Sequence, residues 1–292
     1  MAQEVATGNE EALEAWNGVL FDRFVQYRHL IVDGLAKHGE HAILRCPPQE
    51  GDRVLDVGCG LGDASQRLAE VVGPTGSVLG VDIAPRFIEF SRDDAAEAGI
   101  ENARFAVHDV QSTAFDETFD YAFSRFGTMF FASPVAAMRN VSRALVPGGT
   151  LCMVVWRRKL DNPWMYRAEE VVKPYLEDAE EETDEAHCGP GPFSMANADT
   201  TSQILLGAGF TDLAFHRCDV PFRFGSDLAE AVEFNMALGP AAEAIRFAPN
   251  RAKELRELLV AQLTEALSEF ETPDGVIAAS STWIVTARAA RR

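Results

Sequence analysis

VLDVGCGLGD, at residues 54–63, joins a short apolar strand to a helix through a turn that contains three glycines. The apolar run Val54–Val57 is typical of a strand buried in a parallel sheet. Because glycine has no Cβ, Gly58, Gly60 and Gly62 permit a tight turn and a close approach of a ligand to the backbone. The N–H groups at the start of the next helix would point toward that ligand. The stretch therefore predicts a nucleotide-type site at the carboxyl end of a parallel strand.

Strands and helices alternate around this turn for about a hundred residues. Strands are expected at Val54–Val57, Ser77–Asp82, Ala103–Val107, Phe119–Ser124 and Thr150–Trp156, and helices at Ala64–Val72, Pro85–Ala98 and Pro134–Leu145. Pro147, Gly148 and Gly149 end the last of these helices. This order predicts a parallel sheet with helices on both faces.

Further segments extend this core on both sides. Apolar residues recur at spacings of three and four over residues 13–45, which predicts helices. Helices are also expected over residues 201–209 and 226–270, and strands at Phe210–Phe224 and Trp283–Ala289. We divide the chain into an N-terminal helical extension (1–48), a ligand-binding core (49–156) and the rest of the sheet with helical insertions (157–292). The insertions, at 157–200 and 225–280, are expected to form a lid that shapes the substrate site.

Composition excludes several classes of partner. The formal net charge of −19 would repel a nucleic-acid backbone. The acidic N-terminus is unlike a signal peptide, and no apolar run reaches the ~18 residues of a membrane span, so we expect a cytoplasmic protein without membrane insertion. The five cysteines include no CxxC pair, and adjacent His187 and Cys188 have no second pair at ligand spacing. We therefore expect neither a disulfide framework nor a metal site.

The glycine spacing separates two classes of ligand. Dinucleotide folds favour G-x-G-x-x-G, whereas Gly58, Gly60 and Gly62 give G-x-G-x-G. Asp56 stands two residues before the first glycine, and its carboxylate can accept from an ammonium group, which a pyrophosphate lacks. The pattern favours a ligand with amino acid and nucleoside parts, and an NAD-dependent oxidoreductase stays as a less favoured alternative.

Five ordered segments resemble the motifs of class I S-adenosylmethionine-dependent methyltransferases. They are VLDVGCGLGD (54–63), VLGVDIAP (78–85), FAVHDV (105–110), FDYAFSRFGTMFF (119–131) and RALVPGGTL (143–151). Their common order over roughly residues 50–156 is far more specific than any one of them. The resemblance implies S-adenosylmethionine as cofactor. It also implies an α/β, Rossmann-like, doubly wound sheet of seven mostly parallel strands with an antiparallel last strand, an N-terminal helical extension and a helical lid lobe.

The resemblance also assigns roles to single residues. Asp82 would bind the ribose hydroxyls and Ile83 would pack on the adenine, while Asp109 and the Val110 N–H would contact the edge of the adenine. Ser124 would face the methyl group at the end of the fourth strand. The expected cofactor-binding residues are thus Asp56, Gly58, Gly60, Gly62, Asp82, Ile83, Asp109, Val110 and Ser124. Each of the three acids also has a structural interpretation, as a helix cap or a turn residue.

Two residues are candidates for acting on the methyl acceptor. His29 is the candidate general base, because in many relatives the N-terminal extension folds over the cofactor. Arg125 could hold an anionic acceptor by a bidentate contact, or it could form a structural salt bridge.

The expected reaction is methylation of an oxygen or nitrogen of a small, apolar or aromatic molecule. The segment 124–127 (SRFG) and Trp156 with 161–164 (DNPW) resemble bacterial ubiquinone/menaquinone C-methylating enzymes. C-methylation of a quinone-like substrate is therefore an alternative, as is a non-catalytic protein that binds the cofactor. The expected partner is a small-molecule methyl acceptor, and association of two copies of the chain into a homodimer is an alternative to a monomer.

Overall fold

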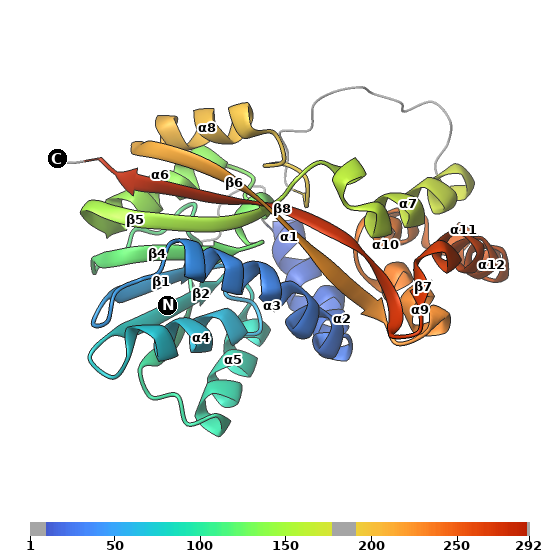
Figure 1. The fold of residues 1–292 in the computed structure, drawn as a ribbon, viewed down its shortest axis with the longest axis horizontal. Coiled ribbons are helices and arrows are strands. Elements are labelled where there is room, and N and C mark those ends of the chain that lie inside the picture. The colour runs from blue at the N-terminus through green and yellow to red at the C-terminus, as the bar shows by residue number, and fades with distance from the viewer. Residues whose placement is uncertain (1–9, 177–190, 291–292) are drawn as a thin grey trace.

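A twisted sheet forms the centre of the molecule in the computed structural model, which describes residues 10–176 and 191–290 (Figure 1). Its strands are β1 (Arg53–Val57), β2 (Ser77–Asp82), β3 (Ala103–Val107), β4 (Phe119–Arg125), β5 (Leu145–Trp156), β6 (Phe210–Gly225), β7 (Glu271–Thr272) and β8 (Gly275–Ala289). Within the described residues the strand order is β3-β2-β1-β4-β5-β8-β6, with β7 paired to β8. Strands β1 to β5 pair in parallel, and β8 is antiparallel to both β5 and β6. The expected fold class is confirmed, with the two-residue β7 as an addition.

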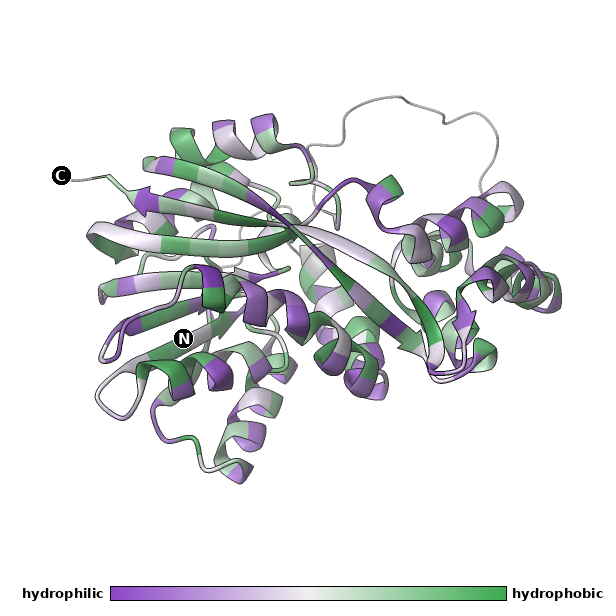
Figure 2. Ribbon diagram, viewed as in Figure 1, coloured by the Kyte–Doolittle hydropathy of each residue, from purple (hydrophilic) through white to green (hydrophobic). Residues whose placement is uncertain are grey.

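Helices cover both faces of the sheet. One face carries α3 (Arg28–Arg45), α4 (Asp63–Val72) and α5 (Pro85–Glu97), and the other carries α6 (Pro134–Ala144) and α8 (Ala198–Gly207). Alternate residues of each strand serve the two faces: in β1, Val54 packs with α4, whereas Leu55 packs with α6. The core strands are accordingly hydrophobic over much of their length (Figure 2). This arrangement directs the carboxyl ends of β1 to β5 to one edge of the sheet.

The N-terminal extension lies against that carboxyl edge. It consists of α1 (Glu10–Ala15), the π-helical turn η1 (Trp16–Leu20) and α2 (Phe21–Gln26), followed by α3. A kink at Gly18, with φ −110° and ψ −114°, changes the direction of the chain between α1 and α2. Trp16 and Phe24 then pack against Leu61, in the glycine turn, and Phe87, in α5. The extension therefore covers the edge where a ligand is expected.

Strands β6 and β8 continue past the core sheet as a two-stranded ribbon, which carries a helical lobe (Figure 1). The lobe contains α7 (Pro163–Leu176), α9 (Leu228–Ala237), α10 (Pro240–Phe247), α11 (Pro249–Glu254) and α12 (Arg256–Leu267). Short 3-10 turns also occur: η2 (Thr128–Phe130) follows β4, η3 (Lys159–Asp161) follows β5, and η4 (Ser268–Phe270) follows α12. We call residues 163–176 and 226–274 the lid lobe. The ribbon and α3 join the lid lobe to the core, since α3 packs along β6.

Two strand boundaries differ from the sequence prediction. Strand β5 begins at Leu145 instead of Thr150, because the Pro-Gly-Gly segment is absorbed as a bulge opposite β4. Strand β8 begins at Gly275 instead of Trp283, so the end of the helical insertion expected over 225–280 is extended chain. Its first half is rich in small residues that carry no strand pattern, and pairing with β6 determines its conformation.

Helix α8 also begins earlier than predicted, at Ala198 instead of residue 201, and ends at Gly207 instead of residue 209. The Asn197 side chain accepts from the N–H groups of Asp199 and Thr200 and so caps the N-terminus of α8. Asparagine is a favoured N-cap residue, so the sequence itself indicates this start.

The acidic segment 177–185 and the pair His187 and Cys188 lie outside the described residues. Among the described helices, none is both long and apolar enough to cross a bilayer.

Candidate functional site at the carboxyl edge of the sheet

The glycine turn after β1 depends on all three glycines. Gly58, Gly60 and Gly62 have φ angles of +70°, +53° and +84°, a region that disfavours any side chain. A Cβ on Gly58 would lie 2.8 Å from the Cα of Gly127, so the ends of β1 and β4 touch through backbone alone. A Cβ on Gly60 would meet no heavy atom of the described residues within 4 Å. The turn thus presents bare backbone beside open space.

Asp82, at the end of β2, is hydrogen-bonded to this turn. Its carboxylate accepts from the N–H of Gly60 at 3.2 Å and from the N–H of Ala84 at 3.0 Å. Burial raises the pKa of Asp82, against the lowering effect of these hydrogen bonds. The His108 N–H donates to the Asp82 carbonyl at 2.9 Å, which brings the end of β3 alongside. Ile83, half-buried, follows directly.

Asp109 organises the turn after β3. Its buried carboxylate accepts from the N–H of Gln111 at 3.0 Å and from the hydroxyl of Ser112 at 2.9 Å. Val110 is also buried, and its carbonyl accepts from the Asn140 side chain at 2.9 Å. These contacts hold Asp109 and Val110 at the edge next to Asp82, and they are also the contacts of a turn residue.

Asp56 lies deeper, under the glycine turn. It is 1% exposed, points toward α4 and accepts from the Ser65 hydroxyl at 2.6 Å. Burial raises its pKa to about 7, against the lowering effects of the Ser65 hydrogen bond and the positive charge of Arg125. A carboxyl group with this pKa can ionise when a cation comes near, as an ammonium group would.

The end of β4 is held by two interactions. The Ser124 hydroxyl donates to the carbonyl of Val57 at 2.7 Å, which joins β4 to β1. Arg125 forms an ion pair with Asp63, the first residue of α4, at 2.8 Å, and its side chain is 11% exposed. In the structure, the contact of Arg125 is thus that of a salt bridge between strand and helix.

His29 lies at the interface with the lid lobe. Its Nε2 is 2.8 Å from Oε1 of Glu230, in α9, and its side chain is 54% exposed. Burial would raise the pKa of Glu230, but hydrogen bonds from the Ser226 N–H and hydroxyl and from His29 lower it to about 2. The pair therefore connects the N-terminal extension to the lid lobe.

Phe126 follows Arg125 with a φ of +63°, which is unusual for a bulky residue and is found where a fold constrains the backbone. Its ring stacks on Trp156 with centroids 4.3 Å apart. The stack continues into the lid lobe as a set of rings that we call the aromatic wall: Phe126, Trp156, Trp164, Phe222, Phe224 and Phe234.

His38 is a buried polar residue beside the candidate site that the sequence analysis did not single out. It is fully buried and lies edge-on to Phe126 and Trp156, at 5.9 and 5.8 Å. Its Nε2 is 2.5 Å from the Ser280 hydroxyl and its Nδ1 is 2.9 Å from the Thr282 hydroxyl. Burial lowers its pKa to about 3, so the ring is neutral at physiological pH. The signal was its position, because the spacing from Ile31 places it on the buried face of the helix.

The N-terminal extension closes the edge from outside. The Trp16 ring meets Phe24, Phe87 and Phe130 at centroid distances of 5.6, 6.3 and 5.0 Å. Asn17 accepts from the Arg86 N–H at 3.0 Å, which fixes the extension to the start of α5. By covering the carboxyl ends of the strands, the N-terminal extension can exclude water from a reaction that takes place there.

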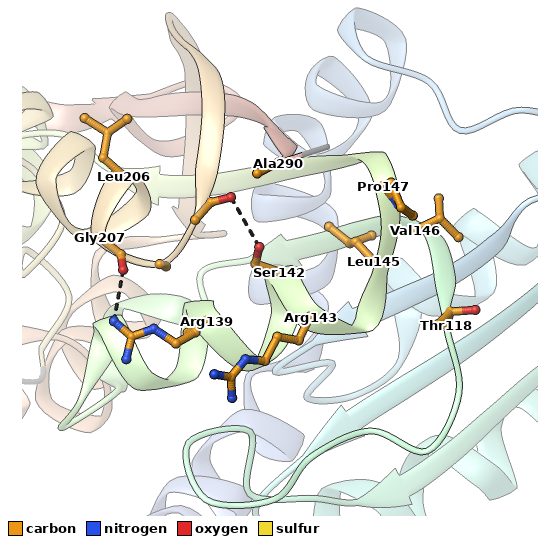
Figure 3. Close-up of a pocket in the computed structure, with 12 residues that line it drawn as sticks. Thr118, Arg139, Ser142, Arg143, Leu145, Val146, Pro147, Leu206, Gly207 and Ala290 are labelled. Carbon is orange, nitrogen blue, oxygen red and sulfur yellow. Dashed lines mark hydrogen bonds between the residues drawn. The ribbon is translucent and has the colours of Figure 1, made fainter. Parts of the chain in front are cut away.

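A cavity of about 530 Å³ lies at the opposite end of the sheet, between α6, α8 and the start of β5 (Figure 3). Pro147, before the parallel part of β5, and Gly209, before β6, line it together with Arg139, whose guanidinium donates to the Gly207 carbonyl at 3.0 Å. Because it is remote from the glycine turn, this cavity does not belong to the candidate site.

Sequence comparisons agree with these features. A family model described as a methyltransferase domain matches residues 48–201, more than half of the chain. The aklanonic acid methyltransferase of Streptomyces sp. (strain C5) is 34% identical over 126 residues, which are 43% of this chain and 57% of that protein. The demethylmenaquinone methyltransferase of Listeria monocytogenes serotype 4a (strain HCC23) is 34% identical over 107 residues, 36% of this chain and 45% of that protein. The matches span about half the length of these curated relatives.

A solved structure shares the fold. Phosphoethanolamine N-methyltransferase 2 of Haemonchus contortus, in complex with S-adenosyl-L-methionine, aligns with a TM-score of 0.59 and 17% identity over 98% of this chain and 61% of that one. At such low identity the likeness shows the fold alone.

Proposed function

The chain belongs to the methyltransferase domain family, with the class I fold, and from this premise we propose that it transfers a methyl group from S-adenosylmethionine to a small molecule. The observation that carries the proposal is the glycine turn with its partner Asp82. Backbone without side chains, a carboxylate fixed at Gly60 and a helix N-terminus meet at one strand end.

The residues at this edge fit the proposed cofactor. Asp82 would accept from the ribose hydroxyls, and Ile83, Asp109 and Val110 would surround the adenine. Asp56, whose pKa of about 7 allows it to ionise beside a cation, would stabilise the ammonium group. A sulfonium methyl group is the electrophile that this cofactor supplies when bound. The protein would contribute position and exclusion of water, since the leaving sulfide needs no activation.

We propose an apolar or aromatic acceptor, methylated at oxygen or nitrogen. The aromatic wall supports this choice, because it runs from Phe126, beside the glycine turn, into the lid lobe. The two curated relatives are named for aklanonic acid and demethylmenaquinone. C-methylation of a quinone-like molecule therefore stays as the second candidate, and the position of the methyl group in the product distinguishes the two.

Action of His29 or Arg125 on the acceptor stays a prediction. Both are engaged in ion pairs, with Glu230 and Asp63, so either would have to exchange its partner for the acceptor. A cytoplasmic location and the absence of a nucleic-acid partner also stay predictions, and the formal net charge of −19, which would repel a nucleic-acid backbone, supports the second.

Two measurements test the proposed function. Calorimetry should show that S-adenosylhomocysteine binds the full chain, whereas NADH should not compete. Transfer of a labelled methyl group from S-adenosylmethionine to a panel of phenols, aromatic acids, amines and quinones should then yield a product. Failure of S-adenosylhomocysteine to bind would contradict the proposal, and binding without transfer to any panel member would favour the non-catalytic alternative.

A further inference from the structure

Trp164, the second residue of α7, carries a buried donor. The side chain is 5% exposed, and its Nε1–H has no hydrogen-bond partner within residues 10–176 and 191–290. Buried indole N–H groups usually find an acceptor, because a lost hydrogen bond is costly there. Trp283 shows the usual case, since its Nε1–H donates to the Ala196 carbonyl at 3.0 Å.

The surroundings of Trp164 are rings. Phe222 lies 4.8 Å away, Phe224 and Phe234 lie 6.0 Å away and Trp156 lies 6.1 Å away, measured between ring centroids. A hydrogen bond formed in such an apolar place is stronger than one formed in water. The donor is therefore placed where it would discriminate well between ligands.

Trp164 is connected to the proposed methyl-transfer site through the aromatic wall. Trp156 lies between Trp164 and the strained Phe126, and Phe126 precedes Gly127, which touches the glycine turn at Gly58. A planar molecule that displaced or extended this stack would have one end near the cofactor-binding edge and the other near the indole N–H.

The charges of the side chains beside the aromatic wall limit the kind of ligand that could bind there. His38, which faces Phe126 and Trp156, is neutral because burial lowers its pKa to about 3. Arg125 is engaged by Asp63. Neither side chain offers a free positive charge to an ionised group among these rings, which would lose its hydration there, so a neutral oxygen is favoured over a carboxylate.

We propose that Trp164 is a specificity-determining residue whose indole N–H donates to a carbonyl or phenolic oxygen of a planar aromatic methyl acceptor. The inference rests on the proposed function, because it names the class of acceptor for that site. It explains why a buried donor without a partner among the described residues is placed among the rings of the aromatic wall.

The test uses 9-fluorenone and fluorene, which share a planar skeleton and differ in the carbonyl oxygen. Both are titrated into the full chain, saturated with S-adenosylhomocysteine and labelled with ¹⁵N in its tryptophans. Fluorenone should bind about tenfold more tightly than fluorene and should shift the Trp164 indole resonance. Trp164→Phe should lose this tenfold preference and keep its affinity for fluorene. Trp283→Phe, which removes an indole N–H already bonded to protein, should keep the preference.

The outcomes separate the two proposals. If S-adenosylhomocysteine does not bind the wild-type chain, the proposed function fails. If it binds, but fluorenone has no advantage over fluorene in the wild type or keeps its advantage in Trp164→Phe, this inference alone is overturned. The resonance shift in the wild type provides a readout even if Trp164→Phe does not fold, since an unmoved Trp164 signal on fluorenone binding also overturns it.

Discussion

Asp82 holds the fold together at the place where the proposed cofactor would bind. Its carboxylate accepts N–H groups from Gly60 and Ala84, so it holds the glycine turn against the end of β2 while remaining half-buried at the edge. Asp56 and Asp109 are buried more deeply and bond to Ser65 and to the Gln111 turn. The three acids therefore differ in accessibility, and Asp82 is the one best placed to meet a hydroxylated ligand.

Replacing Asp82 should weaken cofactor binding. We expect Asp82→Ala to reduce the affinity for S-adenosylhomocysteine by at least ~2 kcal/mol, about thirtyfold, because two hydrogen bonds to a charged acceptor are lost. Calorimetry measures the change. Asp93→Ala, at an exposed position on α5, is the control and should bind normally. Equal affinities in both variants would count against the assignment of Asp82.

Cofactor binding should depend on pH through Asp56. Its pKa of about 7 means that the folded chain keeps this proton more tightly than the unfolded chain does, so the stabilisation from protonation is lost as the pH rises through 7. An ammonium group near Asp56 favours the ionised form, so binding should release the proton. Affinity for S-adenosylhomocysteine should then rise up to tenfold per pH unit below pH 7 and level off above it.

The control for this pH dependence is Asp56→Asn, which can still accept from Ser65 but cannot titrate. Calorimetry from pH 5.5 to 8.5 should show a flatter profile for this variant. A profile parallel to that of the wild type would assign the titration to another group.

The glycine turn is the element that brings β1 and β4 together. Gly58 and Gly127 touch through backbone atoms, and Ser124 adds a hydrogen bond to Val57 just beside them. Phe126, between Ser124 and Gly127, has a positive φ, and its ring stacks on Trp156. The shape of the site thus comes from a contact between two strand ends as well as from the cofactor motif.

A methyl group on Gly58 should separate these strand ends. Gly58→Ala and Gly99→Ala put alanine at nearly the same φ, +70° and +69°, so they share the conformational cost. Only at Gly58 would the Cβ collide with backbone, 2.8 Å from Gly127, whereas at Gly99 it meets no described atom within 4 Å. We expect Gly58→Ala to lose at least ~2 kcal/mol more unfolding free energy than Gly99→Ala, together with most cofactor affinity. Urea unfolding measures the difference, and equal losses would contradict the steric account.

The molecule as a whole is a core sheet with a lid lobe attached through the β6–β8 ribbon and α3. Helix α3 approaches the ribbon closely at Gly34, where an added Cβ would lie 2.2 Å from the Phe222 ring. Phe222 in turn packs on Trp164 in the aromatic wall. A glycine in the N-terminal extension therefore lies at the junction between the core and the lid lobe.

Gly34→Ala should disturb this junction. Overpacking by a methyl group typically costs ~1–3 kcal/mol, which outweighs the ~1 kcal/mol that alanine contributes over glycine in a helix. Gly39→Ala, on the same helix, is the control, because its Cβ would meet the flexible Arg125 side chain at 3.3 Å. Adding Phe222→Leu should restore part of the unfolding free energy lost in Gly34→Ala. If Gly34→Ala is as stable as Gly39→Ala, the proposed packing is wrong.

The sequence was sufficient for the core sheet because the signals there are local. Buried parallel strands are short apolar runs, and glycine or proline marks their ends, so β1, β2, β3 and β4 lie within one residue of the expected bounds. The family resemblance came from the same local motifs, and the family match over residues 48–201 confirms it.

What required the tertiary structure is the set of contacts between residues far apart in the chain. His38 meets Ser280 and Thr282 across more than 240 residues, and Trp164 lies among rings of β5, β6 and α9. The early start of β8 likewise depends on its pairing with β6. The local pattern determined which elements form and where a cofactor motif stands, because these follow from backbone and side-chain chemistry within a few residues. Which side chains meet in the aromatic wall was decided by packing, because long-range contacts leave no periodic trace in the sequence.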